Sequence, residues 1–190
     1  MVPYALVNYG VDTLVLNVRY ADATGKPKTG NDALLPDTLI ECLNAWQSLA
    51  REREEPVVMS GFTFEGAALV IYPHGAGKGQ WRWLIACPSF TLTISRGRLN
   101  GVIAQVRFSA PYLWSHECLD HRQDIWAAIM TVKGFLLGLF GSESGRLHLQ
   151  VSELHLCADL AGWDVSACDW QHSFLSRART RTDRPEEPAA

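Results

Sequence analysis

Residues 57–108 decide the fold: they read VVMSGFTF (57–64), AALVIYP (67–73), WRWLIACP (81–88), FTLTIS (90–95) and GVIAQVRF (101–108). Each segment is short and rich in β-branched or aromatic residues, and Gly, Pro, Ser or Asn residues lie between one segment and the next. Short segments with short connections are typical of strands that pair with their neighbours in sequence. We therefore predict an antiparallel meander over residues 57–114.

Two further strands and two helices are predicted around this meander. Residues 11–20 (VDTLVLNVRY) alternate apolar and polar side chains, as a half-buried strand does. Residues 35–55 and 119–140 repeat apolar side chains every three or four positions, which indicates amphipathic helices, and residues 147–160 alternate again. This order predicts an α+β fold, in which an antiparallel sheet carries two main helices on one face.

The composition is that of one globular domain. Of the 190 residues, 47% are hydrophobic and 19% are charged, which excludes a disordered, collagen-like or coiled-coil protein. We place a single α+β domain at residues 1–165. Residues 166–190 lose apolar periodicity and finish in Pro, Glu and Ala, so we predict a disordered tail there.

Cysteine usage and hydropathy bear on the compartment. The five cysteines are widely spaced and form no CxxC pair, which favours reduced thiols in the cytoplasm. The first residues have neither the basic start nor the apolar core of a signal peptide. The most apolar helical stretch, residues 125–140, is shorter than the ~20 residues of a membrane span, so we expect no membrane partner.

The charge is distributed unevenly along the chain. The 17 basic and 20 acidic residues give a net charge of −3, which excludes a uniformly basic nucleic-acid coat. Residues 74–116, however, contain no acidic residue, so this stretch is a candidate surface for DNA. Its basic residues, which we take as candidate DNA contacts, are Lys78, Arg82, Arg96, Arg98 and Arg107.

Aromatic residues accompany these charges. Trp81 and Trp83 flank Arg82, and such a combination suits single-stranded nucleic acid, because bases stack on rings and phosphates need positive charge. The alternative, which the sequence leaves open, is that both tryptophans belong to the core and the arginines form a solvated face.

The strand predicted at 147–160 carries a second candidate site. In VSELHLCADLAGWD (151–164), period-two alternation places four groups that can bind protons or metals on one face: Glu153, His155, Cys157 and Asp159. Carboxylate and imidazole groups on a rigid element are typical ligands of divalent cations. We therefore take Asp159, His155 and Glu153 as candidate metal ligands, with an ordinary solvent-exposed strand face as the alternative.

Two motifs resemble the N-terminal half of the replication initiation factors of plasmids and filamentous phages. The first is Val-Asp-x-Leu-x-Leu in an early strand, here residues 11–16. The second is Arg-x-Asp-Leu-x-x-Asp followed by Gly, here residues 153–159 and then Gly162. Leu156 and Asp159 match this second motif, whereas Glu153 stands where the family has Arg and His155 where it has Asp.

The resemblance implies rolling-circle replication, in which a tyrosine hydroxyl attacks a phosphodiester and a divalent metal, Mg²⁺ or Mn²⁺, polarises the phosphate. In the family that tyrosine follows the strand that ends in Asp. All five tyrosines lie upstream of that strand here: Tyr4, Tyr9, Tyr20, Tyr72 and Tyr112. We therefore assign no nucleophile, and we expect a truncated relative, a chain that lacks its C-terminal portion, or a homodimer.

The sequence thus predicts a DNA-binding, replication-initiator-like protein that recognises a single-stranded or hairpin origin. Whether it is an enzyme, a metal-dependent tyrosine DNA endonuclease, stays open. A non-catalytic or degenerate interaction protein of a mobile element is the alternative, and a metal-dependent hydrolase that uses the Glu/His/Asp strand is a third.

Overall fold

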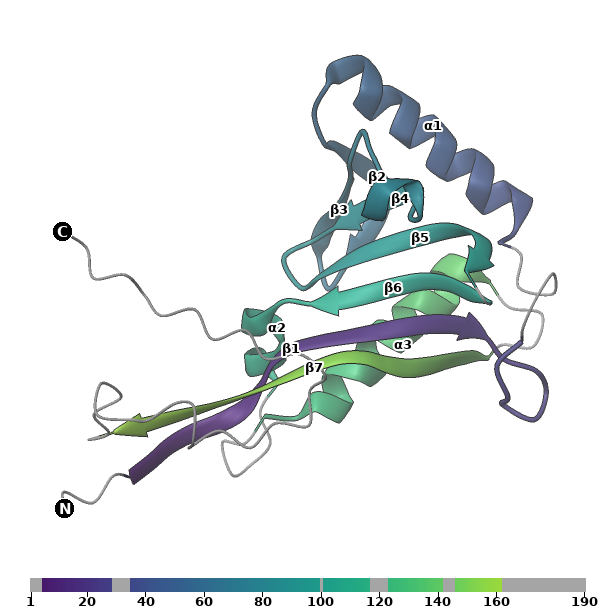
Figure 1. Ribbon diagram of the computed structural model, residues 1–190. Helices are drawn as coiled ribbons and strands as arrows, with labels where there is room; N and C mark the ends of the chain where they lie inside the picture. Colours follow the sequence, from purple (N-terminus) through teal and green to yellow (C-terminus); the bar gives the residue numbers. More distant parts are fainter. Residues whose placement is uncertain (1–4, 29–34, 100, 117–122, 142–145, 162–190) are drawn as a thin grey trace. The chain divides into compact units, whose positions relative to one another are not determined.

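The computed structural model describes residues 5–28, 35–99, 101–116, 123–141 and 146–161, without the side chains of residues 5–8, 78, 96–99 and 158–161. In these residues one open antiparallel sheet has seven strands in the order β2-β3-β4-β5-β6-β1-β7, and three α-helices accompany it (Figure 1). The strands are β1 (Ala5–Tyr20), β2 (Val57–Phe64), β3 (Ala67–Ile71), β4 (Trp83–Ala86), β5 (Phe90–Leu99), β6 (Val102–Phe108) and β7 (Leu147–Ala161). The helices are α1 (Asp37–Arg53), α2 (Ala110–Ser115) and α3 (Ile125–Phe140), and a short 3-10 helix, η2, spans Gly77–Gly79.

The predicted meander is confirmed for β2 to β6, which are neighbours in sequence and in the sheet. The prediction is wrong at its end, because residues 110–115 form α2 instead of continuing a strand. Ser109 caps this helix by accepting a hydrogen bond from the backbone N–H of Tyr112, and Pro111 occupies its first turn. A serine cap followed by proline is a helix-start signal that outweighs the apolar run around it.

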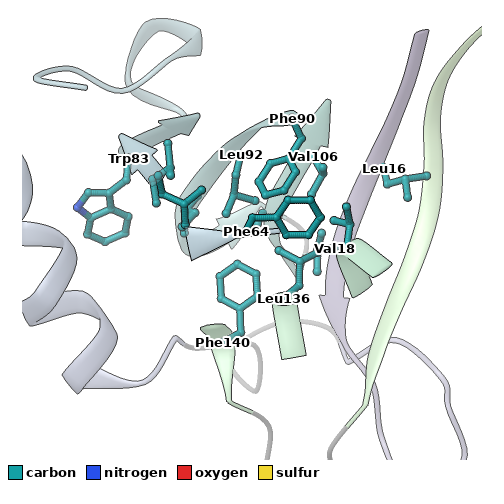
Figure 2. Packing of buried hydrophobic residues seen from close by; sticks show 14 of the residues in the cluster. Leu16, Val18, Phe64, Trp83, Phe90, Leu92, Val106, Leu136 and Phe140 are labelled. Carbon is teal, nitrogen blue, oxygen red and sulfur yellow. The ribbon is translucent and has the colours of Figure 1, made fainter. Parts of the chain in front are cut away.

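One face of the sheet builds the core. The register aligns Val57, Ile71, Ile85, Leu92, Val106 and Leu16 as consecutive partners across six strands, and all six are buried. Buried residues of α1, such as Leu43, belong to the same cluster. So do Leu136 and Phe140 of α3 (Figure 2). The predicted packing of two main helices on one face of an antiparallel sheet is therefore confirmed.

In each strand, the residue next to the member of this buried row points to the opposite face of the sheet, and these neighbours form a second row. These partners are Val58, Val70, Ala86, Thr91, Arg107 and Val15, and none of them belongs to the core cluster. A neighbouring row on the same face pairs Leu84 with Thr93, Thr93 with Gln105, and Gln105 with Asn17. We call the surface formed by Asn17, Thr91, Thr93, Gln105 and Arg107 the outer face.

The chain divides into two compact units. One comprises residues 9–157 and contains the whole core cluster, and the other comprises residues 1–8 and 158–190. The single domain predicted at 1–165 includes residues of both units, and the tail predicted at 166–190 lies outside the described residues. None of the helices among the described residues is both long and apolar enough to cross a membrane.

Candidate functional site

A chain of three charged or titratable side chains joins β6 to β7. The Arg107 guanidinium lies 2.9 Å and 3.0 Å from the two carboxylate oxygens of Glu153, and both hydrogen bonds come from one Arg107 nitrogen. The Nε2 atom of His155 lies 3.4 Å from the Oε1 atom of Glu153. The Arg107 side chain is 53% exposed and that of His155 is 60% exposed, so the cluster faces solvent.

Strand geometry explains this cluster. Val106 and Phe108 point into the core, so Arg107 between them points to the outer face. Arg107 then reaches past β1, which lies between β6 and β7, to meet Glu153. Glu153 and His155 are two residues apart and share a side of β7, as the alternation predicts. The structure therefore brings together one candidate DNA contact and two candidate metal ligands.

Polar side chains lie near Arg107 on the outer face, although its direct partner on β1 is the buried Val15. The Gln105 side chain donates a hydrogen bond of 3.1 Å to the Asn17 side chain, one row away from Arg107. Thr91 and Thr93 are half-buried on β5, directly opposite Arg107 and Gln105. This surface can donate and accept hydrogen bonds beside the exposed Arg107 guanidinium, which suits a polar anionic ligand.

Arg82 lies elsewhere, at the junction of β4 with α1. Its guanidinium donates a hydrogen bond of 2.7 Å to the Asn44 side chain and lies 5.0 Å from the centre of the Trp83 ring. Trp83 is fully buried and points into the core cluster (Figure 2), so it offers no surface on which a base could stack. Trp83 therefore belongs to the core, which is the alternative that the sequence left open for it. Arg82 connects α1 to the sheet through its hydrogen bond to Asn44.

The other three candidate DNA contacts have side chains outside the described residues. Lys78 lies in η2, and Arg96 and Arg98 lie in β5.

The described residues supply only two of the ligands that a metal site would need. They contain no group of three or more His, Cys, Asp or Glu side chains placed to hold an ion. Glu153 and His155 supply two donors, but Arg107 already occupies the Glu153 carboxylate. The Cys157 thiol is directed at the Gly10 carbonyl oxygen, 3.6 Å away. Asp159 belongs to β7, and its side chain lies outside the described residues.

Two of the five tyrosines are poor candidates for a nucleophile. Burial raises the pKa of Tyr20 to about 12, and its hydroxyl donates a hydrogen bond of 3.2 Å to the Phe140 carbonyl oxygen. Burial is also the main cause that raises the pKa of Tyr112 to about 12. A phenol that resists ionisation and is enclosed by the core is unsuited to attack a phosphate.

An apolar groove between α3 and β7 was not predicted from the sequence. It has a volume of about 620 Å³, and Trp126, Met130, Leu149 and Val151 are among its lining residues. Trp126 is 69% exposed. The signal was present in the sequence: Trp126 and Met130 are four residues apart, on a side of α3 different from that of the buried Ala128, Val132 and Leu136.

Comparisons with models of known families, with curated proteins and with solved structures find no match to this chain.

Proposed function

We propose that this protein binds single-stranded DNA on the outer face of its sheet, as a replication-initiator-like protein of the cytoplasm. The observation that carries the proposal is the position of Arg107, an exposed cation on the outer face between Thr91 of β5 and Val15 of β1. The acid-free stretch from residue 74 to residue 116 and the resemblance of residues 153–159 to the replication initiation factors support it.

Glu153 has a defined part in this proposal. Its carboxylate is the anion that Arg107 binds in the structure, so a DNA phosphate would compete with it for the same guanidinium. Gln105 and Asn17 would contact sugars or base edges beside that phosphate. The affinity should fall steeply with salt, because each phosphate contact releases a counterion.

The resemblance also implies Mg²⁺ or Mn²⁺ at Asp159, and the alternation of β7 adds His155 and Glu153 as candidate second ligands. The two described donors are an oxygen and a nitrogen, a mixture that suits Mn²⁺ better than Mg²⁺. A cation there would neutralise the carboxylate that holds Arg107. DNA binding as proposed does not require it.

The test is fluorescence anisotropy of labelled single-stranded and hairpin oligonucleotides, titrated with the 190-residue chain at several salt concentrations. Arg107→Ala should weaken binding and lower the salt slope by about 0.7, the loss of one phosphate contact to a single strand. Glu153→Gln should strengthen binding, because it frees Arg107 and removes a negative charge. Arg53→Ala, which removes an exposed arginine of α1, is the matched control and should change neither quantity.

Two results would contradict the proposal. One is the absence of binding at low salt, which would favour the alternative of a non-catalytic interaction protein. The other is equal loss of affinity in Arg107→Ala and Arg53→Ala, which would place the DNA elsewhere or make the attraction a general charge effect.

A further inference from the structure

The apolar groove between α3 and β7 has the size and the lining of a small-molecule site. Its volume of about 620 Å³ lies within the range of roughly 300–1,000 Å³ that is usual for such sites. Trp126, Met130 and Val151 line it, and all three are exposed apolar side chains, whose gathering on one surface is typical of a binding site. Leu16, a member of the buried row, also lines the groove. The groove therefore lies on the side of the sheet opposite the outer face.

A glycine keeps the middle of this groove open. Gly134 is an interior residue of α3 and lines the groove. Beyond its adjacent residues and its own helix backbone, a Cβ atom at this position would meet no heavy atom within 4 Å. Glycine inside a helix is unfavourable relative to alanine, so a larger residue here would favour the helix at the expense of the groove. Gly138, one turn further along α3, is equally unobstructed but does not line the groove, so it is a matched control position.

Positive charge lies at the same groove. Lys133 of α3 and Arg146, which directly precedes β7, line it, and none of the described residues that line it is Asp or Glu. The Arg146 guanidinium donates a hydrogen bond to the Ala23 carbonyl oxygen in the loop after β1. The Asp22 carboxylate of that loop accepts three hydrogen bonds from within the loop itself. An apolar lining with two cations complements a ligand that has an apolar body and one negative group.

We propose that this groove binds an unesterified fatty acid. The acyl chain lies against Trp126, Met130 and Leu149, where its removal from water supplies affinity, and the carboxylate meets Lys133 and Arg146. The volume of the groove favours this ligand over a protein partner, because a stable protein interface covers a larger surface, roughly 800 Å² on each partner. The two cations favour it over a neutral lipid. The inference does not rest on DNA binding, which uses the other side of the sheet.

The first test is isothermal titration calorimetry of the 190-residue chain with decanoate, below the concentration at which decanoate forms micelles. Binding should be saturable, and decyltrimethylammonium, which has the same chain and a positive head group, should bind about tenfold more weakly or less. Gly134→Leu fills the groove and should raise the dissociation constant for decanoate by about tenfold or more, whereas Gly138→Leu should leave it unchanged. Leucine favours a helix over glycine, so both variants should fold, and circular dichroism checks this.

The second test stays decisive if Gly134→Leu fails to fold. Lys133→Met keeps a long apolar side chain but removes the charge, so it should weaken decanoate binding by about tenfold and leave decyltrimethylammonium binding no weaker. In ¹H–¹⁵N spectra of the unchanged chain, decanoate should shift the indole N–H signal of Trp126 in the groove. The signal of Trp83, which is buried in the core, should stay in place.

Four results would overturn the proposal. The first is the absence of decanoate binding, and the second is equal affinity for decanoate and decyltrimethylammonium, which would make the contact purely apolar. The third is a decanoate affinity that neither Gly134→Leu nor Lys133→Met lowers, which would place the ligand elsewhere. The fourth is binding to phosphatidylglycerol vesicles without binding of free decanoate, which would identify a membrane surface as the partner. None of these results bears on DNA binding at the outer face.

Discussion

The two faces of the sheet differ although the same strands build them. On the inner face Leu92 and Val106 are fully buried beneath the helices, whereas on the outer face Thr93 and Gln105, one residue away, are only half-buried. Inner positions are apolar because their burial stabilises the fold. Outer positions tolerate polar and charged groups such as Arg107, so they are available for a function. The difference teaches that stability and the candidate site can be changed separately in this molecule.

The largest expected effect is a difference in the free energy of unfolding between two neighbouring positions of β5, one on each face of the sheet. Leu92→Ala removes a fully buried side chain and should lower the free energy of unfolding by about 2–5 kcal/mol. Thr93→Ala removes a half-buried hydroxyl with only a long hydrogen bond of 3.4 Å to the Gln105 carbonyl oxygen, and it should cost less than about 1 kcal/mol. Urea unfolding of both variants measures this. Equal losses would mean that the outer face is packed as tightly as the core.

A smaller effect on stability is expected at alkaline pH, and it comes from Tyr20 in the core cluster. Burial raises the folded pKa of Tyr20 to about 12 from its ordinary value of 10.0, so between these pH values the unfolded chain loses a proton that the folded chain keeps. Stability should therefore fall as the pH rises above about 10. Tyr20→Phe should make this fall shallower in urea unfolding between pH 8 and pH 11. An unchanged slope would show that Tyr20 ionises as readily in the folded chain as in the unfolded one.

Local pattern was enough to predict much of the fold. Period-two segments predicted the meander, and three- and four-residue spacing predicted α1 and α3, because burial on one face imposes those periods. β1 nevertheless begins at Ala5, earlier than the predicted Val11. Helix α2 was missed because its apolar residues continue the run of the meander, and only Ser109 and Pro111 mark its start.

The sequence was enough to predict which residues are candidates for the site, but not how they are arranged in space. Arg107 and Glu153 are 46 residues apart in the sequence. They meet because β6 and β7 are both neighbours of β1 in the sheet, and periodicity does not specify this strand order. Arg82 and Arg107 looked equivalent in the sequence, yet one binds α1 and the other lies on the outer face. The alternation around Leu154 and Leu156 was predicted, but periodicity alone did not specify that both leucines are exposed.

The most direct test of the account uses side-chain amide signals in a ¹H–¹⁵N NMR titration with an unlabelled single-stranded oligonucleotide. Asn17 and Gln105 hydrogen-bond each other on the outer face, whereas Asn44 and Gln47 hydrogen-bond Arg82 beside α1. The account predicts that the Asn17 and Gln105 signals shift as DNA is added and that those of Asn44 and Gln47 stay in place. Shifts confined to Asn44 and Gln47, or no shift in any of the four, would contradict it.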